Sequence, residues 1–163
     1  MGSDHDEFNR LVALLDYPMF IVTTAAGDVR SGCLVGFATQ ASIHPPRFLV
    51  CLSVKNLTYR VAAEAEVLVV HLVQDGAREL AELFGGETGD DTDKFARCQW
   101  TPGPGGAPVL SELENWFAGR IIGRSDFGDH SGFLLDPVQE RAASSEGTLT
   151  FHDAQEIEPG HKP

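Results

Sequence analysis

Apolar residues near the start of the chain recur with the spacing of one helix face. Positions i, i+3, i+4 and i+7 are occupied by Phe8, Leu11, Val12 and Leu15. Tyr17-Pro18 follows, and the residue before a proline avoids the helical conformation, so the helix is expected to end before Tyr17. The pattern predicts one short amphipathic helix whose apolar face covers a core.

The next apolar segments have the β-branched and aromatic content of strands. Residues 19–24 and 29–40 flank Gly27-Asp28, a pair that favours a tight turn, so we expect them to form a hairpin. Pro45-Pro46 cannot lie in a central strand. After it, residues 48–52 are apolar enough to predict a core strand that is buried on both faces.

Residues 56–86 are expected to place a strand between two helices. Asn56 can cap a helix from Leu57 to about Glu64. Residues 67–73 predict a strand, in which His71 is interpreted as an accommodated histidine rather than a ligand. The helical spacing of residues 77–84 predicts a second helix, stopped by Gly85-Gly86.

Two long strand candidates dominate the rest of the chain. Residues 113–123 and 132–144 are joined through a polar turn at 125–129, and residues 148–151 are expected to add a short last strand. The acidic segment 87–93 and the Pro/Gly-rich segment 101–108 are interpreted as exposed loops. Many strands with few short helices predict a mostly-β fold, an antiparallel barrel.

Composition is that of one folded domain. The 163 residues are 42% hydrophobic and 22% charged, so we expect a single domain over 1–163 with flexible ends at 1–6 and 154–163. The three cysteines form no Cys-x-x-Cys pair and the histidines no cluster, which argues against disulfides and a metal site. With a polar start and no apolar run of roughly 20 residues, we expect a cytoplasmic protein without a membrane segment.

The net charge of −12, from 24 acidic and 12 basic residues, opposes binding to nucleic acid and to anionic lipid. The chain also lacks a P-loop, a Gly-x-Gly-x-x-Gly after a strand, and Gly-x-Ser-x-Gly. Composition and periodicity alone therefore indicate only a β-rich domain.

The most informative stretch runs from Gly32 to Ser53 and continues from Lys55 to Thr58. Its sequence, GCLVGFATQASIHPPRFLVCLS and then KNLT, resembles the flavin reductase-like family of FMN-binding split barrels. In that family a strand opens with Gly, closes at Ser-x-x-Pro-Pro, and is followed by an apolar strand and a Ser/Thr-bearing turn. The resemblance implies an antiparallel Greek-key barrel of about six strands that binds FMN or FAD at a homodimer interface.

The resemblance assigns the flavin ring to the strand that follows Gly32. A flat, largely apolar ring with polar edges needs aliphatic walls and a few aimed donors. The positions implied to pass the ring, the ribityl chain and the redox edge are Val35, Gly36, Phe37, Ala38, Thr39, Gln40, Ala41 and Ser42. The chain departs from the family at Gly36-Phe37-Ala38, where many members carry two small hydroxyl residues and Phe, and at His44, where an acid is common.

The flavin phosphate needs concentrated donors, and the turn after the apolar strand offers hydroxyls, an ammonium and a helix start at Ser53, Lys55, Asn56 and Thr58. The alternative is that Asn56 only caps a helix and Lys55 is a solvated loop charge. Lys94-Phe95 resembles a basic residue and Phe that the family places near the cofactor or the partner subunit. A surface lysine and a packed phenylalanine explain this pair equally well.

Gly128-Asp129-His130 resembles the late Asp-His of the family, at which the histidine faces the nicotinamide or the flavin. His130 is therefore the candidate catalytic residue, either orienting the nicotinamide amide or tuning the ring, and a histidine that buttresses the strand turn is the alternative. Trp100 and Trp116 are assigned to a core or a dimer interface and not to the site.

The function that the resemblance implies is reduction of FMN or FAD by NADH or NADPH, with a partner monooxygenase as one acceptor of the reduced flavin. Two alternatives stay open. One is an oxidoreductase that keeps a flavin or deazaflavin and acts directly on an organic substrate. The other is a flavin-binding module without turnover.

Overall fold

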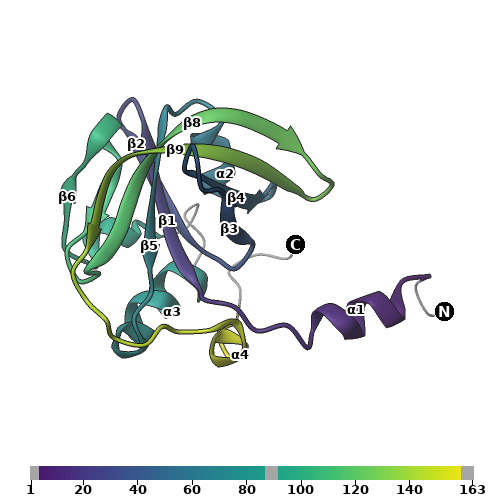
Figure 1. Ribbon diagram of the computed structural model, residues 1–163. Helices are drawn as coiled ribbons and strands as arrows, with labels where there is room; N and C mark the ends of the chain where they lie inside the picture. The colour runs from purple at the N-terminus through teal and green to yellow at the C-terminus, as the bar shows by residue number, and fades with distance from the viewer. Residues whose placement is uncertain (1–3, 87–91, 159–163) are drawn as a thin grey trace.

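Seven antiparallel strands form one curled sheet in the order β2-β1-β5-β8-β9-β4-β3 (Figure 1). The computed structural model describes residues 4–86 and 92–158. The strands are β1 (Phe20–Ala26), β2 (Val29–Val35), β3 (Ala38–Ser42), β4 (Arg47–Ser53), β5 (Val67–Leu72), β8 (Asn115–Asp126) and β9 (His130–Ala142). The mostly-β prediction is confirmed. No described pairing joins the edge strands β2 and β3, so the seven strands form an open sheet, and the split barrel that the resemblance implies stays a prediction.

The predicted first hairpin forms, but its second strand is shorter than expected. β1 pairs with β2 around Gly27, whose φ of +58° suits a glycine turn. The segment 29–40 is interrupted at Gly36-Phe37, where the chain leaves one edge of the sheet and begins β3 at the other. One apolar run therefore supplies both edge strands.

The concave face of the sheet encloses the main core. Val22, Val50, Leu52, Phe133 and Leu135 are each at most 1% exposed there. The alternate residues of β4 are only half-buried, so the prediction that this strand is buried on both faces is wrong. β4 lies next to the edge strand β3, and among the described elements no continuous layer covers its outer face.

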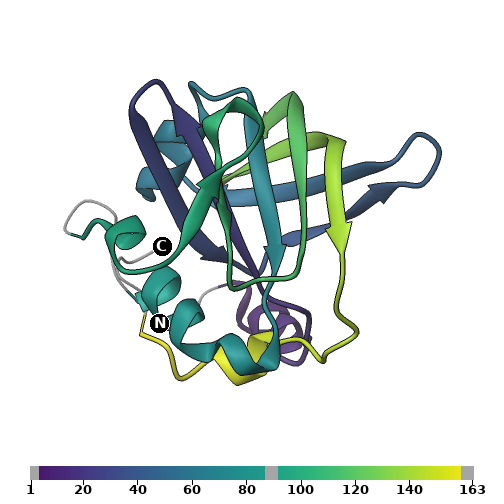
Figure 2. The same ribbon diagram turned by 90° about the vertical axis from the view of Figure 1, so that its left-hand side faces the viewer.

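Helix α2 (Leu57–Ala62) packs against β1 and β2, beside which it lies in Figure 2. Asn56 caps it as predicted, because its side-chain oxygen accepts a hydrogen bond from the Thr58 amide at 3.0 Å. At the other terminus, the Arg124 guanidinium donates to the carbonyls of Ala62 and Ala65. The predicted helix α3 (Arg78–Gly86) also forms and packs Leu80 and Phe84 into a second core.

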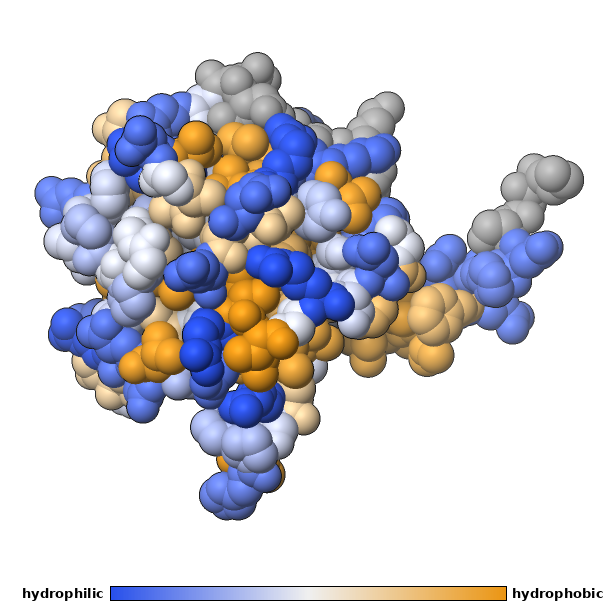
Figure 3. All heavy atoms as spheres, turned by 90° about the horizontal axis from the view of Figure 1, so that it is seen from above, coloured by the Kyte–Doolittle hydropathy of each residue, from blue (hydrophilic) through white to orange (hydrophobic). Residues whose placement is uncertain are grey.

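Helix α1 (Asp6–Val12) projects away from the sheet and buries no residue (Figure 1). The prediction that it covers a core is therefore wrong. Phe8 and Leu11 are each 60% exposed and Leu15 is 54% exposed. Figure 3 shows this arm with apolar atoms along one side and hydrophilic atoms along the other.

Two further expectations meet a different structure. The loop at 101–108 contains a small hairpin of β6 (Trp100–Pro102) and β7 (Pro108–Leu110), around the 3-10 turn η3 (Pro104–Gly106). Residues 148–151 form isolated bridges and then α4 (Phe151–Ala154), because Thr150 and Asp153 make a capping box. The remaining 3-10 turns are η1 (Asp75–Ala77) and η2 (Lys94–Ala96).

Some expectations concern residues that the structure does not describe. Most of the predicted acidic loop, at 87–91, lies outside the described residues, as do 1–3 and 159–163 of the expected flexible ends. Across 4–86 and 92–158, no helix is long and apolar enough to span a membrane, and no group of three or more metal-ligating side chains occurs.

His71 is a core histidine, as predicted. Its side chain is fully buried, and its Nδ1 lies 2.9 Å from the Ile21 carbonyl oxygen. Its Nε2 accepts a hydrogen bond from the Leu110 amide at 3.0 Å. The ring therefore joins β1 and β5 to the β7 hairpin.

Candidate functional site

A groove of about 880 Å³ lies over the outer face of β3 and β4, with α1 as its opposite wall. Its strand side is formed by Gly36, Phe37, Ala38, Thr39, Leu49 and Cys51, its base by Tyr17 and Phe151, and its helix side by Phe8, Asn9, Val12, Ala13 and Leu15. Leu49 and Cys51 alternate with the buried core residues of β4, so the half-buried face of this strand is a wall of the groove. The lining is mostly apolar, which suits a flat ring.

The base of the groove explains one departure from the family pattern. A Cβ atom on Gly36 would lie 2.7 Å from Cε2 of Tyr17. The ring of Tyr17 in turn stacks on Phe151, with centroids 4.8 Å apart. Sequence reasoning missed Tyr17 and Phe151 as site residues, and the glycine at position 36 was the signal that a large side chain lies against this strand.

Three sequence segments meet at Phe37, a residue that lines the groove. The ring of Phe37 lies 4.9 Å from the ring of His130, centroid to centroid. His130 is directly paired with Ser53 across β4 and β9, and the Val54 amide donates to the Asp129 carbonyl at 2.9 Å. The structure therefore brings the predicted ring strand, the predicted phosphate turn and the predicted catalytic histidine together.

The Asp129 carboxylate holds the imidazole at this junction. Nδ1 of His130 and Oδ1 of Asp129 are 2.8 Å apart. This hydrogen bond, the charge of His130 and the nearby ammonium of Lys55 lower the pKa of Asp129. An ionised Asp129 favours the His130 tautomer with a proton on Nδ1 and an accepting Nε2.

Cys51 contributes an uncharged thiol to the groove wall. Burial raises the pKa of its thiol, so the reactive thiolate is disfavoured at neutral pH.

Four of the predicted ring-binding residues lie away from this groove. Val35 is 5% exposed and belongs to the core inside the sheet. Gln40 and Ser42 border a different cavity at the open end of the sheet. Ala41 is exposed at an irregularity in the β3–β4 pairing.

Thr58 also serves the fold. Its fully buried hydroxyl lies 2.9 Å from the Ser31 hydroxyl, and its amide is bonded to the cap residue Asn56. Ser53 and Lys55 are the members of the predicted phosphate set on the side of the turn that faces Asp129 and His130.

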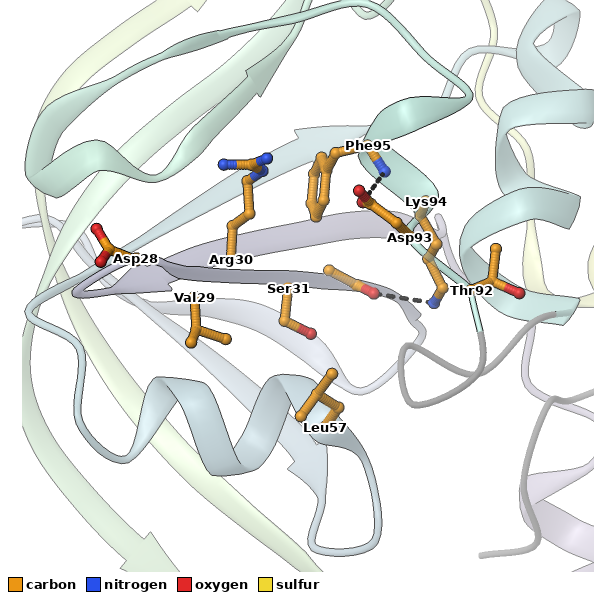
Figure 4. Close-up of a pocket in the computed structure, with 10 residues that line it drawn as sticks. Asp28, Val29, Arg30, Ser31, Leu57, Thr92, Asp93, Lys94 and Phe95 are labelled. Carbon is orange, nitrogen blue, oxygen red and sulfur yellow. Dashed lines mark hydrogen bonds between the residues drawn. The ribbon is translucent and has the colours of Figure 1, made fainter.

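Lys94 and Phe95 line a separate pocket of about 400 Å³ between β2, Leu57 and residues 92–95 (Figure 4). The Lys94 ammonium is buried and donates to the carbonyls of Gly32 and Phe84, each at 3.0 Å. Phe95 packs between Phe84 and Trp100. The structure thus places this pair in a packed junction, where the lysine is not on the surface as the simpler interpretation expected.

Comparison with known proteins agrees with this geometry. The family model described as "Flavin reductase like domain" matches residues 12–156. The chain belongs to this family.

Its relatives include the protein named FMN reductase (NADH) RutF of Methylorubrum extorquens, which is 30% identical over 91% of this chain and 72% of its own. Among solved structures, an NADH:FAD oxidoreductase of Streptomyces globisporus superposes with a TM-score of 0.82 at 19% identity, covering 93% of this chain and 91% of that one. A homologue of nitrilotriacetate monooxygenase component B from Mycobacterium thermoresistibile gives a TM-score of 0.79 at 19% identity, covering 91% and 82%.

Proposed function

We propose that this protein is a flavin reductase that passes a hydride from NADH or NADPH to FMN or FAD. The observation that carries the proposal is that Phe37, which lines the apolar groove, contacts the ring of His130, which in turn is paired with Ser53. The names of the relatives in the same family support it. The flavin supplies the ring that accepts the hydride, and the protein supplies position and environment.

The residues of the groove fit a flavin. Leu49, Cys51 and the backbone at 36–39 give an apolar wall of the kind that a ring needs. Ser53 and Lys55 offer a hydroxyl and an ammonium for the phosphate just past Phe37 and His130. In this proposal the ring lies along β3 and β4 and the phosphate lies at the turn before α2.

His130 is proposed to position the nicotinamide. With Nδ1 held by Asp129, its Nε2 can accept a hydrogen bond from the carboxamide of the donor. Phe37 supports one face of the imidazole. The step needs no acid from the protein, because only a hydride passes from the nicotinamide ring to the flavin ring.

A homodimer and a partner monooxygenase complete the proposal. The exposed apolar side of α1 forms one wall of the groove, and a second copy of the chain could pack against it.

A relative described as a monooxygenase component favours an oxygenase as acceptor of reduced flavin. Free cysteines at 33, 51 and 98 are consistent with a cytoplasmic location.

The first experiment measures oxidation of NADH and of NADPH at 340 nm with FMN or FAD added. Turnover with at least one pair is expected. Tight flavin binding without turnover would instead favour the binding module. Turnover only when an organic acceptor is added would favour the direct oxidoreductase, and no flavin affinity would contradict the whole proposal.

The second experiment tests the phosphate position through Lys55→Ala. Loss of a charge-assisted hydrogen bond is expected to weaken FMN binding roughly tenfold, while riboflavin, which lacks the phosphate, binds unchanged. Arg78→Ala is the matched control, because Arg78 forms an exposed ion pair with Glu82 on α3. Equal FMN affinity of Lys55→Ala and wild type, measured by fluorescence titration, would place the phosphate elsewhere.

A further inference from the structure

The pocket between β2 and residues 92–95, which we call the edge pocket, lies beside an edge strand of the sheet (Figure 4). Its volume of about 400 Å³ falls within the range of pockets that hold small molecules, roughly 300–1,000 Å³. We propose that the edge pocket binds the adenosine group of FAD, so that FAD binds more tightly than FMN. This inference rests on the proposed function and names the flavin that the protein prefers.

The edge pocket continues from the turn that is proposed to hold the flavin phosphate. That turn runs from Ser53, which is paired with His130 beside the groove, to Leu57, which lines the edge pocket. The hydroxyl of Ser31, another lining residue, lies 2.9 Å from the hydroxyl of Thr58. In FAD the adenosine is attached through the phosphate at which FMN ends. With that phosphate at this turn, the adenosine lies within reach of the edge pocket.

The charged side chains of the edge pocket favour a group without charge. The lining holds two acidic residues, Asp28 and Asp93, and two basic residues, Arg30 and Lys94. The Lys94 ammonium is buried, and it donates hydrogen bonds to two backbone carbonyls. Because the two signs balance, neither an anion nor a cation gains from the lining as a whole. Adenosine, which is polar and uncharged, fits this balance.

A planar cation borders the edge pocket on one side. The guanidinium carbon of Arg30 lies 4.6 Å from the centroid of the Trp100 ring, so one face of the group covers this ring. Nucleobases stack on arginine planes, and the second face of the guanidinium is suited to such a contact. Figure 4 shows Arg30 on one side of β2, with Val29 and Leu57 on the other. A flat base at the edge of the strand therefore meets a planar cation and apolar side chains.

The outer edge of β2 offers backbone groups that match adenine. The Gly32 carbonyl faces away from β1, because it accepts a hydrogen bond from Lys94. Outward-facing residues alternate along a strand, and the β1–β2 register is regular, so the amide and carbonyl of Arg30 face the same way. Adenine carries an acceptor at N7 beside a donor at N6. The donor and acceptor of one edge residue complement this pair.

Asp28 supplies an acceptor for the ribose. It lies in the turn between β1 and β2, is exposed, and lines the edge pocket. Within residues 4–86 and 92–158 its carboxylate makes no ion pair. An acidic side chain of this kind accepts hydrogen bonds from ribose hydroxyls in dinucleotide-binding proteins. The edge pocket thus has a group for the base and a group for the sugar.

The first test compares FAD with FMN by fluorescence titration, with and without adenosine. FAD is expected to bind roughly tenfold more tightly than FMN, because it adds stacking and hydrogen bonds in the edge pocket. Saturating adenosine is expected to weaken FAD to the level of FMN and to leave FMN unchanged. Equal affinity of the two flavins would overturn the proposal, and so would competition between adenosine and FMN.

The second test removes the stacking group from an exposed position. Arg30→Ala is expected to weaken FAD and adenosine roughly fivefold and to leave FMN unchanged. Arg30→Lys keeps the charge without the plane and is expected to weaken them nearly as much. Arg141→Ala, at an exposed arginine of β9, is the matched control and should change none of these affinities. Equal losses of FAD and FMN affinity in Arg30→Ala would contradict the assignment.

The third test separates the ribose from the base, with adenosine and adenine titrated by calorimetry. Asp28→Ser is expected to weaken adenosine severalfold and to leave adenine unchanged, because only adenosine carries the sugar hydroxyls. An equal effect on both probes would overturn the placement of the ribose at Asp28.

The results also separate this inference from the proposed function. FMN turnover without any binding advantage for FAD would contradict the edge-pocket assignment alone. With FMN as the acceptor, a KM for NADH that rises with adenosine would assign the pocket to the nicotinamide donor and overturn its assignment to FAD. Absence of binding by either flavin would overturn both the proposed function and this inference.

Discussion

At Gly36 the neighbouring side chains leave no space for a side chain larger than hydrogen. The Tyr17 ring occupies the space where a Cβ would stand, and the Met19 sulfur lies 3.3 Å from that point. Any larger side chain must push the Tyr17–Phe151 stack into the groove.

Gly36→Ala is therefore expected to destabilise the protein by about 1–3 kcal/mol and to weaken flavin binding. Gly123→Ala is the control, because the nearest atom to its added Cβ is at 3.6 Å, an ordinary contact, and an effect within about 0.5 kcal/mol is expected. Urea unfolding and FMN titration measure both effects. Equal stability of the two variants would show that Tyr17 moves aside freely.

His71 makes the fold sensitive to acid. Burial lowers its pKa to about 4, because a second ring proton would face the Leu110 amide with no acceptor. Between about pH 6.5 and pH 4 the unfolded chain binds a proton that the folded chain does not. The contribution of His71 to stability is therefore complete above about pH 6.5 and is lost as the pH falls toward 4.

The expected loss over this interval is about 3 kcal/mol in the free energy of unfolding, measured by urea titration across the pH range. His71→Gln is expected to be less stable at neutral pH and to lack this part of the pH dependence. His152→Gln, at a partly exposed position on α4, is expected to retain it. A wild-type profile that is flat between pH 6.5 and 4 would contradict this assignment.

At the scale of elements, α1 stands apart from every other helix. α2 and α3 each bury an apolar face against the sheet, whereas α1 buries none. A helix of seven residues is marginal without a packing partner, so its apolar side needs cover. The proposed second copy provides that cover.

Leu11→Ser combined with Leu14→Ser is expected to shift the dimer toward monomer, because these side chains are exposed in one chain and do not line the groove. Sedimentation velocity over a range of protein concentrations measures the shift. Val138→Ser, at an exposed apolar residue on β9, is the control. If wild type and double variant sediment alike as monomers, α1 is not a dimer element.

At the scale of the whole molecule, the net charge of −12 opposes the approach of phosphate-bearing ligands. Lys55 near the proposed phosphate position acts against this, but only over a short distance. The overall field is screened as the Debye length falls from about 30 Å at 0.01 M salt to about 8 Å at 0.15 M.

The association rate of FMN is therefore expected to rise severalfold over this range of ionic strength, as measured by stopped-flow fluorescence. Riboflavin, which carries no phosphate charge, is the control and is expected to show no change. A rate for FMN that falls with salt would mean that the local field of Lys55 dominates the encounter.

The sequence by itself determined the class of fold, the cap at Asn56, both interior helices, the core role of His71 and the family. These features depend on local periodicity, on neighbouring residues, or on a motif that is contiguous in the chain. The same motif also predicted that the flavin site lies within the segment from Gly32 to Thr58.

Only the tertiary structure decided which residues of that segment meet the groove. Strand residues alternate between two faces, and which face is a groove depends on elements distant in the chain. Thus the Phe37 ring contacts His130, whereas Gln40 borders a different cavity at the open end of the sheet. Thr58 and Lys94 are buried and form hydrogen bonds with residues distant in the chain. The exposure of the apolar face of α1 could not be predicted from the sequence either. An amphipathic pattern predicts that a face is buried, but it does not say whether the face packs on its own chain or on another one.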